Sequence, residues 1–299
     1  ISKLVKSVSP DFIYLNGMYA LYYSIYPLLT KKLNITSAKV ILAPRGMLQK
    51  GALQFKPFRK KLFLKIIAAL SIPKLITGHA TDEQEKNDIY KYLPGIRNVL
   101  VLSNFSSDVA ASPLPIRKQK NEISAVFISR ISPKKNLYAF ISQLNTLSPS
   151  VNFRFTVFGG IEDDAYWNEC EQSIARLPQN IIVTYKGPVS NNEVPAILKD
   201  HHIFVLPTLG ENFGHAIFEA LSVGRPVLIS DQTPWRNLES RRAGWDLPLD
   251  NPSAFIDTLE QIAEMDNEDF QSWCNGAWQL ANEYVIKNDL KNQYLKLFS

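Results

Sequence analysis

Cysteine is scarce in this sequence: the 299 residues include only two, Cys170 and Cys274. They form no CxxC pair, and no histidine stands near either of them at the spacing of a metal ligand. A zinc site and a disulfide framework are therefore not expected. We predict reduced thiols and no bound metal.

The sequence also lacks a run of about 18 apolar residues, which a membrane-spanning helix would need. No charged and then apolar leader with a small-residue cleavage site opens the chain. With the reduced thiols, these absences favour a cytoplasmic protein. The chain starts at Ile1 rather than at methionine, which fits processing, an upstream segment or a fragment.

The charge is unevenly distributed, although Lys and Arg exceed Asp and Glu only by 33 to 28. Residues 1–120 hold 19 basic and 6 acidic side chains, which leaves 14 and 22 for residues 121–299. This asymmetry predicts two surfaces with different partners. Hydrophobic residues make up 45% of the chain, enough for one large or two medium globular domains.

Short apolar runs alternate with amphipathic stretches along the chain, a pattern typical of βαβ units and parallel sheets. In the first half the sequence predicts strands at 12–16, 40–43, 75–79 and 98–102, and helices near 20–32, 58–70 and 82–92. In the second half it predicts strands at 125–129, 153–158, 181–185, 203–206 and 226–230, and one or two helices within 268–298. We therefore expect an α/β fold whose second half is a complete doubly wound domain.

Residues 111–121 contain prolines and a basic cluster but few apolar side chains, which is typical of a linker. We therefore predict a first domain at 1–110 and a second at 122–275, followed by a C-terminal segment at 276–299. With only four predicted strands, the first domain is thin.

The most informative stretch runs from Pro207 to Leu221, where an apolar run has just ended and a helix begins near Gly214. Loops at the carboxyl edge of a parallel sheet bind ligands, and the free amides and dipole of a helix start favour a phosphate. Glu211 and Glu219 flank this helix start and would repel a phosphate unless they bind hydroxyl groups. A diphosphate with polyols at both ends meets both demands. In the alternative interpretation, Glu211 caps the helix and Glu219 is a solvated carboxylate.

This stretch, with the Gly-Arg-Pro-Val that follows it, resembles the E-x7-E signature of the retaining GT-B glycosyltransferases of family 4, the glycosyl transferases group 1. The resemblance implies that Glu211 contacts the donor sugar and Glu219 the ribose of the nucleotide. The donor site would also include four residues at the helix start: Asn212, Phe213, Gly214 and His215.

The same family resemblance implies a GT-B architecture, in which two Rossmann-like doubly wound domains face a cleft. The N-terminal domain would be incomplete, because roughly its first three strands would lie upstream of Ile1 or be lost. Residues 276–299 would form a helix that packs back on that domain.

A second family element follows the strand predicted at 125–129. Arg130 and Lys135 match the cationic pair of the family and are expected to neutralise the departing diphosphate. Lys134, between them in the sequence, is expected to face solvent.

Two further segments of the second half are less specific. Lys186, Gly187 and Pro188 resemble the family loop that lines the nucleotide base, but an ordinary tight turn explains them equally well. Trp235 and Trp245 could line the cleft, and we favour buried packing for both.

In the first half the resemblance is carried by Pro44–Leu48, which contains Arg45, and by His79–Glu85. Both resemble segments on the acceptor side of the cleft. His79 is expected either to be a satisfied, partly buried histidine or to touch the donor phosphate or the acceptor. Asn16 stands where many members of the family have a histidine, and we assign no general base because asparagine cannot take up a proton.

Residues Lys50–Lys65 combine aromatic and aliphatic side chains with six Lys and Arg residues. Such a stretch predicts peripheral contact with an anionic membrane, here at the inner face of the cell membrane. A core helix with a solvated basic face is the alternative. No nucleic-acid-binding pattern accompanies the charge, so we expect no nucleic acid as a partner.

Taken together, the sequence predicts a hexosyltransferase of surface polysaccharide synthesis. It would move a hexose-type sugar from a UDP- or GDP-linked donor to a hydroxyl of a glycan or lipid-linked glycan, with the anomeric configuration retained. Its catalytic residues would be Glu211, Arg130 and Lys135. No DxD triad is present, so neither a metal nor another cofactor is expected.

Two other classes share this fold. A non-catalytic nucleotide-sugar-binding or scaffold protein is the main alternative. A phosphorylase would carry pyridoxal phosphate on a lysine, and the sequence gives no support for it.

Overall fold

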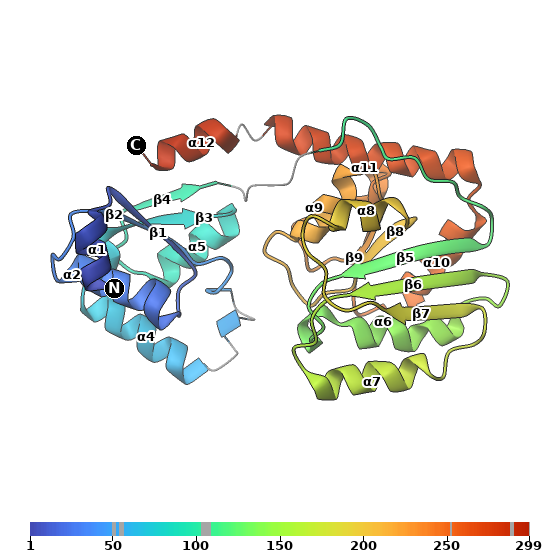
Figure 1. Ribbon diagram of the computed structural model, residues 1–299, viewed down its shortest axis with the longest axis horizontal. Coiled ribbons are helices and arrows are strands. Elements are labelled where there is room, and N and C mark those ends of the chain that lie inside the picture. Colours follow the sequence, from blue (N-terminus) through green and yellow to red (C-terminus); the bar gives the residue numbers. More distant parts are fainter. Residues whose placement is uncertain (50–51, 54–56, 103–108, 252, 288–289, 299) are drawn as a thin grey trace. The chain divides into compact units, whose positions relative to one another are not determined.

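The computed structural model describes residues 1–49, 52–53, 57–102, 109–251, 253–287 and 290–298. The chain divides into two compact units (Figure 1). The first comprises Ile1–Phe105 together with Asn288–Ser299, and the second comprises Ser106–Lys287. Each unit contains a parallel β-sheet with packed helices, which confirms the predicted α/β fold class.

The first unit is built on a four-stranded sheet in the order β1-β2-β3-β4. Its strands are β1 (Phe12–Asn16), β2 (Lys39–Ala43), β3 (Ile76–Ala80) and β4 (Asn98–Val101). Its helical segments are α1 (Ser2–Val8), a π-helical turn (Leu21–Ile25), α2 (Tyr26–Lys32), α4 (Pro57–Ala69), a 3-10 turn (Ile72–Leu75), α5 (Glu83–Tyr92) and α12 (Leu290–Leu297).

Different helices pack on the two faces of this sheet. Successive strand residues point to opposite faces, so Leu15 and Leu42 join the buried core formed with α4 and α5 on one face. Ile41 lies on the other face and packs against Leu297 of α12. Helix α12 thereby attaches the end of the chain to the first unit.

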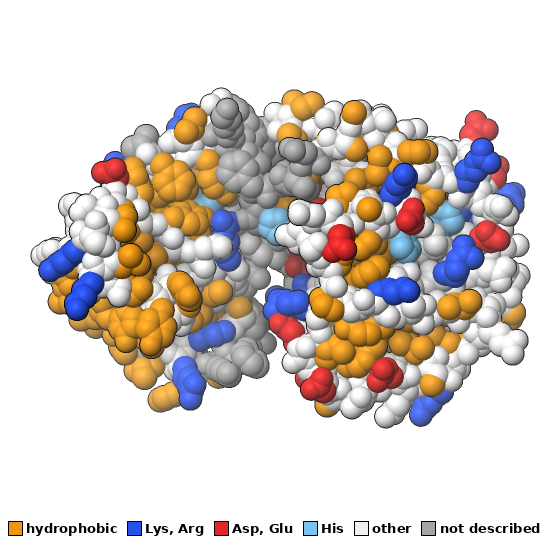
Figure 2. All heavy atoms as spheres, in the orientation of Figure 1, with side chains coloured by type: hydrophobic (Ala, Val, Ile, Leu, Met, Phe, Trp, Pro, Cys, Tyr) orange, Lys and Arg blue, Asp and Glu red, His pale blue; other side chains and the backbone are white. Residues whose placement is uncertain are grey.

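Helix α4 buries only one of its sides. Leu64 and Ile67 belong to the core, whereas Phe58, Leu62 and Ile66 recur every four residues on the outer side, with exposed fractions of 79%, 48% and 48%. We call these three residues the outer stripe of α4. Figure 2 shows hydrophobic side chains gathered over the part of the first unit that contains α2 and α4.

The second unit is built on a six-stranded parallel sheet in the order β10-β9-β8-β5-β6-β7. Its strands are β5 (Glu122–Ile128), β6 (Asn152–Phe158), β7 (Ile181–Tyr185), β8 (Ile203–Leu206), β9 (Val227–Ser230) and β10 (Gly244–Leu247). Its α-helices are α6 (Leu137–Gln143), α7 (Asp164–Ile174), α8 (Val194–Lys199), α9 (His215–Ser222), α10 (Ser253–Glu264) and α11 (Asn267–Lys287).

The strand order of the second sheet fixes which loops become neighbours. Strand β5 pairs with β6 on one side and with β8 on the other. The order of the strands reverses there, and open α/β sheets bind ligands outside the carboxyl ends of the strands at such a switch point. The loops that follow β5 and β8 are the two that carry Lys135 and Glu211.

All nine predicted strands are present, and their ends agree with the prediction to within three residues. Strand β10 and helix α1 were not predicted. The β10 sequence Gly-Trp-Asp-Leu is short and contains no apolar run, and α1 buries none of its residues, so neither gives a clear pattern.

The structure divides the chain differently from the sequence around residues 111–121. This segment lies within the second unit and is pinned to it: Leu114 N donates to the Val223 carbonyl (3.0 Å), and Gln271 Nε2 donates to the Ile116 carbonyl (2.6 Å). The predicted C-terminal segment is divided as well. Residues 276–287 continue α11 in the second unit, and only the part with α12 belongs to the first.

His202 is a structural histidine of the second unit. Its Nδ1 accepts a hydrogen bond from Ser124 N (2.9 Å), so the proton sits on Nε2, which donates to the Arg117 carbonyl (2.8 Å). Burial is the main cause that lowers the pKa of His202, to about 4. The ring therefore stays neutral in the folded protein.

Acid should destabilise the second unit through this group. The unfolded chain takes up a proton near pH 6.5 and the folded chain only near pH 4, so stability is complete above pH 6.5 and falls below it. The loss amounts to at most about 3 kcal/mol at pH 4. Urea unfolding at pH 7 and pH 5 should show a smaller drop in His202→Asn than in the wild type, and equal drops would contradict this assignment.

Candidate functional site

Two loops of the second unit meet beside β5 and β8. Lys135 ends a 3-10 turn (Pro133–Lys135) after β5, and Glu211 lies between β8 and α9. The Lys135 Nζ forms an ion pair with Glu211 Oε1, and only 10% and 13% of the two side chains are exposed. Two residues predicted for the donor site are thus in direct contact, although 76 positions separate them.

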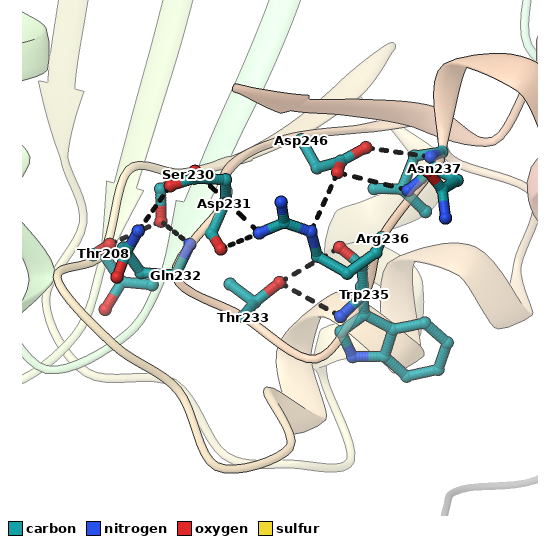
Figure 3. Close-up of polar contacts among 10 residues, drawn as sticks. Thr208, Ser230, Asp231, Gln232, Thr233, Trp235, Arg236, Asn237 and Asp246 are labelled. Atoms are coloured by element: carbon teal, nitrogen blue, oxygen red, sulfur yellow. Dashed lines mark hydrogen bonds and ion pairs between the residues drawn. The ribbon is translucent and has the colours of Figure 1, made fainter. Parts of the chain in front are cut away.

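Hydrogen bonds to backbone carbonyls connect these two loops to each other and to the loop after β9. The Lys134 carbonyl accepts a hydrogen bond from Thr208 Oγ1 (3.2 Å), and the Thr208 carbonyl accepts one from Ser230 at the end of β9. Glu211 N donates to the carbonyl of Gln232 (3.0 Å). Figure 3 shows Thr208, Ser230 and Gln232 together at this point. The backbone of Glu211 is therefore held by the loop after β9.

Arg130 follows β5 but takes another partner. Its guanidinium pairs with Glu162 in the loop after β6 (2.5 Å), and 66% of its side chain is exposed. Lys134 is exposed, as expected, yet the surrounding protein still desolvates its ammonium and so lowers its pKa. Glu211 raises that pKa, while Lys135 and Arg130 lower it.

Glu219 lies on α9 and is half-buried. Within the part of the chain that the structure describes, its carboxylate has no hydrogen-bond or ion-pair partner. Burial raises the pKa of Glu219. A carboxylate that loses water without gaining a partner is costly, and groups perturbed in this way cluster at functional sites. The geometry thus disfavours a simply solvated carboxylate.

The start of α9 requires glycine. Gly214 is the N-cap, with φ of 78°, and a Cβ there would lie 2.6 Å from Ile217 Cδ1. Gly214 has no side chain that could cap this helix, and the Glu211 carboxylate is paired with Lys135, so the structure does not support the alternative in which Glu211 caps α9. His215 is exposed at the first helical position.

Phe213 is buried rather than open to a ligand. Its ring packs among Phe218, Trp235 and Tyr284, and also lies 5.0 Å from the ring of His215. Any contact of Phe213 with a donor must therefore come from its backbone. Asn212, just before it, is half-buried. Trp235 and Trp245 are both buried, as favoured from the sequence.

Lys186, Gly187 and Pro188 form the turn after β7. Gly187 has φ of 77°, and its carbonyl accepts a hydrogen bond from Gly159 N (2.9 Å) at the end of the neighbouring strand β6. The side chains of Lys186 and Pro188 are exposed. This geometry is compatible with both interpretations of the turn.

His79 in the first unit is fully buried. Its Nδ1 shares a hydrogen bond with Tyr14 Oη (2.6 Å), and its Nε2 bonds the Leu102 carbonyl (2.9 Å). Burial lowers the pKa of His79 and raises that of Tyr14 to about 12. Because both ring nitrogens are hydrogen-bonded within the protein, the geometry favours the interpretation of His79 as a structural histidine over contact with the donor or the acceptor.

Arg45 and Asn16 meet at the carboxyl ends of β2 and β1. Arg45 Nε donates to Asn16 Oδ1 (2.8 Å), and its Nη2 donates to Tyr14 Oη (2.8 Å). Arg45 itself is half-buried and has φ of 55°. The side chain is therefore directed by two neighbouring residues of β1.

Glu85 holds the turn that contains Arg45 and Gly46. The sequence does not single out this residue within the segment His79–Glu85. Its carboxylate is buried and accepts hydrogen bonds from Gly46 N (2.6 Å), Thr81 N (2.8 Å) and Thr81 Oγ1 (2.7 Å). Glu85 stands in the first turn of α5, where a glutamate is ordinarily solvated and favoured by the helix dipole. Nothing in the local sequence distinguishes it from such a residue.

The described residues contain no group of three or more His, Cys, Asp and Glu side chains placed to hold a metal ion. No helix within the described ranges is both long and apolar enough to cross a bilayer.

Comparison with known proteins extends these observations. The chain is 24% identical over 207 residues to the putative colanic acid biosynthesis glycosyltransferase WcaL of Escherichia coli, which covers 65% of this chain and 50% of that protein. It is 25% identical over 215 residues to an Escherichia coli protein named UDP-Gal:alpha-D-GlcNAc-diphosphoundecaprenol alpha-1,3-galactosyltransferase, covering 68% of this chain and 54% of the relative. The chain thus spans about half the length of these curated relatives.

A solved structure, HepE of Anabaena in complex with UDP and glucose, matches with a TM-score of 0.73 at 16% identity, over 99% of this chain and 80% of HepE. At that identity the match establishes the fold alone. Residues 122–265 match the sequence model of the glycosyl transferases group 1. The resemblance seen in the sequence is thereby confirmed for the second unit, whose residues 122–265 match the glycosyl transferases group 1, and the chain has the GT-B fold.

Proposed function

We propose that this chain is a glycosyltransferase of surface polysaccharide synthesis that moves a hexose-type sugar from a nucleotide-diphosphate donor to a glycan or lipid-linked hydroxyl, with retention of configuration. The observation that carries the proposal is the Lys135–Glu211 pair at the switch point of the second sheet. It stands next to the glycine N-cap of α9, on which the half-buried Glu219 lies.

The charges of this site suit a leaving diphosphate. An ammonium group has three donor hydrogens, so Lys135 can keep its bond to Glu211 and still donate to a phosphate oxygen. Arg130 can leave its exposed partner Glu162 at little cost, because surface ion pairs contribute about 0–1 kcal/mol. The amides at the start of α9 would add dipolar stabilisation.

The carboxylates suit the two polyol ends of the donor. Glu211 would accept a hydrogen bond from a sugar hydroxyl while Lys135 offsets its charge, and Glu219 would bind the ribose hydroxyls. We assign no covalent role to Glu211, because it serves as a hydroxyl acceptor here. No metal is needed in this proposal, since Lys135 and Arg130 supply the positive charge.

The names of the relatives suggest which nucleotide donor and which class of acceptor to test first. HepE was solved with UDP and glucose, and the galactosyltransferase relative is named for UDP-Gal and a diphosphoundecaprenol-linked acceptor. We therefore propose UDP as the first candidate nucleotide and GDP as the second, with a glycan or lipid-linked acceptor. Arg45 and Asn16 of the first unit are the proposed acceptor contacts. We leave His79 out of the proposal because both of its ring nitrogens are hydrogen-bonded.

We also propose that the outer stripe of α4 contacts an anionic membrane. Phe58, Leu62 and Ile66 are exposed together, and the exposed basic residues Lys61 and Lys65 flank them. This combination of apolar and cationic side chains suits the surface of a bilayer. Residues 50–51 and 54–56 of the predicted membrane segment lie outside the described residues, so the proposal rests on α4 alone.

The nucleotide site is tested with Glu219→Ala, measured by calorimetry with UDP and with GDP. We expect binding of the preferred nucleotide to weaken by about 1–3 kcal/mol, because the ribose hydroxyls lose their acceptor. Glu169→Ala, which removes an exposed carboxylate from α7, is the matched control and should bind like the wild type. Unchanged affinity in Glu219→Ala would remove the ribose assignment.

Lys135→Ala should lower turnover by about 100-fold with little change in the KM of the acceptor, because it removes a charge that acts on the leaving group. Circular dichroism at the assay temperature checks that the variant is folded. Lys134→Ala, next in the sequence, should lose much less. An effect confined to acceptor affinity would contradict the leaving-group role, and a wild type that binds nucleotide sugars without turnover would favour the non-catalytic alternative.

The membrane proposal predicts that the wild type sediments with vesicles of anionic phospholipid at low salt and not with phosphatidylcholine vesicles. Phe58→Ser with Leu62→Ser should reduce the bound fraction at least about tenfold, because two exposed apolar anchors are lost. Leu4→Ser changes an exposed leucine on α1 and serves as the control. If wild type and double variant sediment alike, the outer stripe is not the contact.

A further inference from the structure

The loop after β9, residues 231–237, forms hydrogen bonds at two positions with the loop between β8 and α9. The Gln232 carbonyl accepts a hydrogen bond from Glu211 N (3.0 Å). The indole Nε1 of Trp235 donates to the carbonyl of Phe213 (2.6 Å). The segment from Glu211 to Phe213, just before the N-cap of α9, is therefore fixed at both ends by one neighbouring loop.

That loop is itself firmly held. Arg236 lies between two carboxylates, with Nε 3.3 Å from Asp246 Oδ2 and a guanidinium nitrogen 4.0 Å from Asp231 Oδ2. Asp246 also accepts hydrogen bonds from the backbone of Asn237 (3.2 Å) and Leu238 (2.9 Å). Figure 3 shows these contacts on one side of the loop, with the indole of Trp235 pointing away from them.

The indole is buried and immobilised by aromatic packing. Its ring centroid lies 5.5 Å from that of Phe213, 6.0 Å from Phe218 and 5.4 Å from Tyr284. A donor held in this way fixes the direction of the carbonyl that it binds, because neither the ring nor the loop can follow a rotated peptide.

The Phe213 carbonyl belongs to the same peptide group as the Gly214 N–H. In a planar trans peptide the C=O and N–H bonds point in opposite directions, so holding one of them sets the other. Gly214, with φ of 78°, lacks a side chain that would otherwise restrict this peptide. The Trp235 bond thus decides where the first amide of the α9 start points.

We propose that Trp235 is a positioning residue that orients the Phe213–Gly214 peptide so that the Gly214 N–H faces the distal phosphate of the donor. This inference rests on the proposed function. It adds a residue outside the predicted site, and it assigns the hydrogen bond, not the bulk of the ring, as the feature that matters for diphosphate binding.

Trp245 provides a matched control. It is also a buried tryptophan of the second unit, stacked on Trp273 at 4.1 Å, but among the described residues its Nε1 has no hydrogen-bond partner. Trp245→Phe therefore removes the same atoms as Trp235→Phe without removing such a bond.

The test compares UDP with UMP, and GDP with GMP, by calorimetry on the wild type and both variants. Trp235→Phe should weaken binding of the preferred diphosphate about tenfold, as expected for one lost positioning bond, and change that of the matching monophosphate less than about twofold. Trp245→Phe should change neither. Equal weakening of mono- and diphosphate, or the same diphosphate loss in Trp245→Phe, would overturn the inference.

A second variant separates the bond from the packing. Benzothienylalanine at position 235 keeps the size of the ring and replaces the N–H by sulfur, so it should reproduce the diphosphate loss even if Trp235→Phe folds poorly. Full diphosphate affinity in this variant would refute the inference and leave the proposed function intact. A wild type that binds neither UDP nor GDP would refute both.

Discussion

The ion pair between Lys135 and Glu211 is the interaction on which the candidate site of the second unit depends. It exists because β5 and β8 are adjacent in the sheet and parallel, so that their following loops emerge at the same edge. Nearly buried charges are tolerated only when paired and hydrogen-bonded, and the backbone ties among the neighbouring loops hold this pair in place. A preorganised cation beside an acceptor carboxylate is the arrangement that transfer from a sugar diphosphate would use.

A second interior charge of this unit precedes β9, at the amino end of that strand. Arg225 follows α9 and is fully buried, and its guanidinium donates to the carbonyls of Leu198 and Lys199 at the end of α8 and to that of Leu114. Burial lowers the pKa of Arg225, yet the helix-end carbonyls offset part of the lost hydration. The arginine of the Gly-Arg-Pro-Val stretch therefore fixes the end of α9 and the segment around Leu114 instead of contacting a ligand.

The first unit shows the same use of buried polar groups. Glu85 holds the turn at Gly46, and the Tyr14–His79 pair sits beneath Arg45, so one half-exposed guanidinium is presented by a buried network. Such a network rigidifies a site when all its members are satisfied. The outer stripe of α4 shows the reverse arrangement: its apolar side chains are exposed and not packed into a core formed by the described residues.

The sequence alone determined the α/β class, nine of the strands and the segments that carry Lys135, Glu211 and Glu219, because apolar periodicity and glycine placement are local properties. It predicted a linker at 111–121, which the structure groups with the second unit, and it left the role of His79 open. Both depend on partners far away in the chain, such as Gln271 and Tyr14. The sequence indicated the segment that ends at Glu85 and indicated Trp235 as a candidate cleft residue, but it did not predict the roles that these two residues have. Their roles come from a buried carboxylate and an indole meeting distant backbone groups, and only tertiary packing decides which polar atoms meet once water has been excluded.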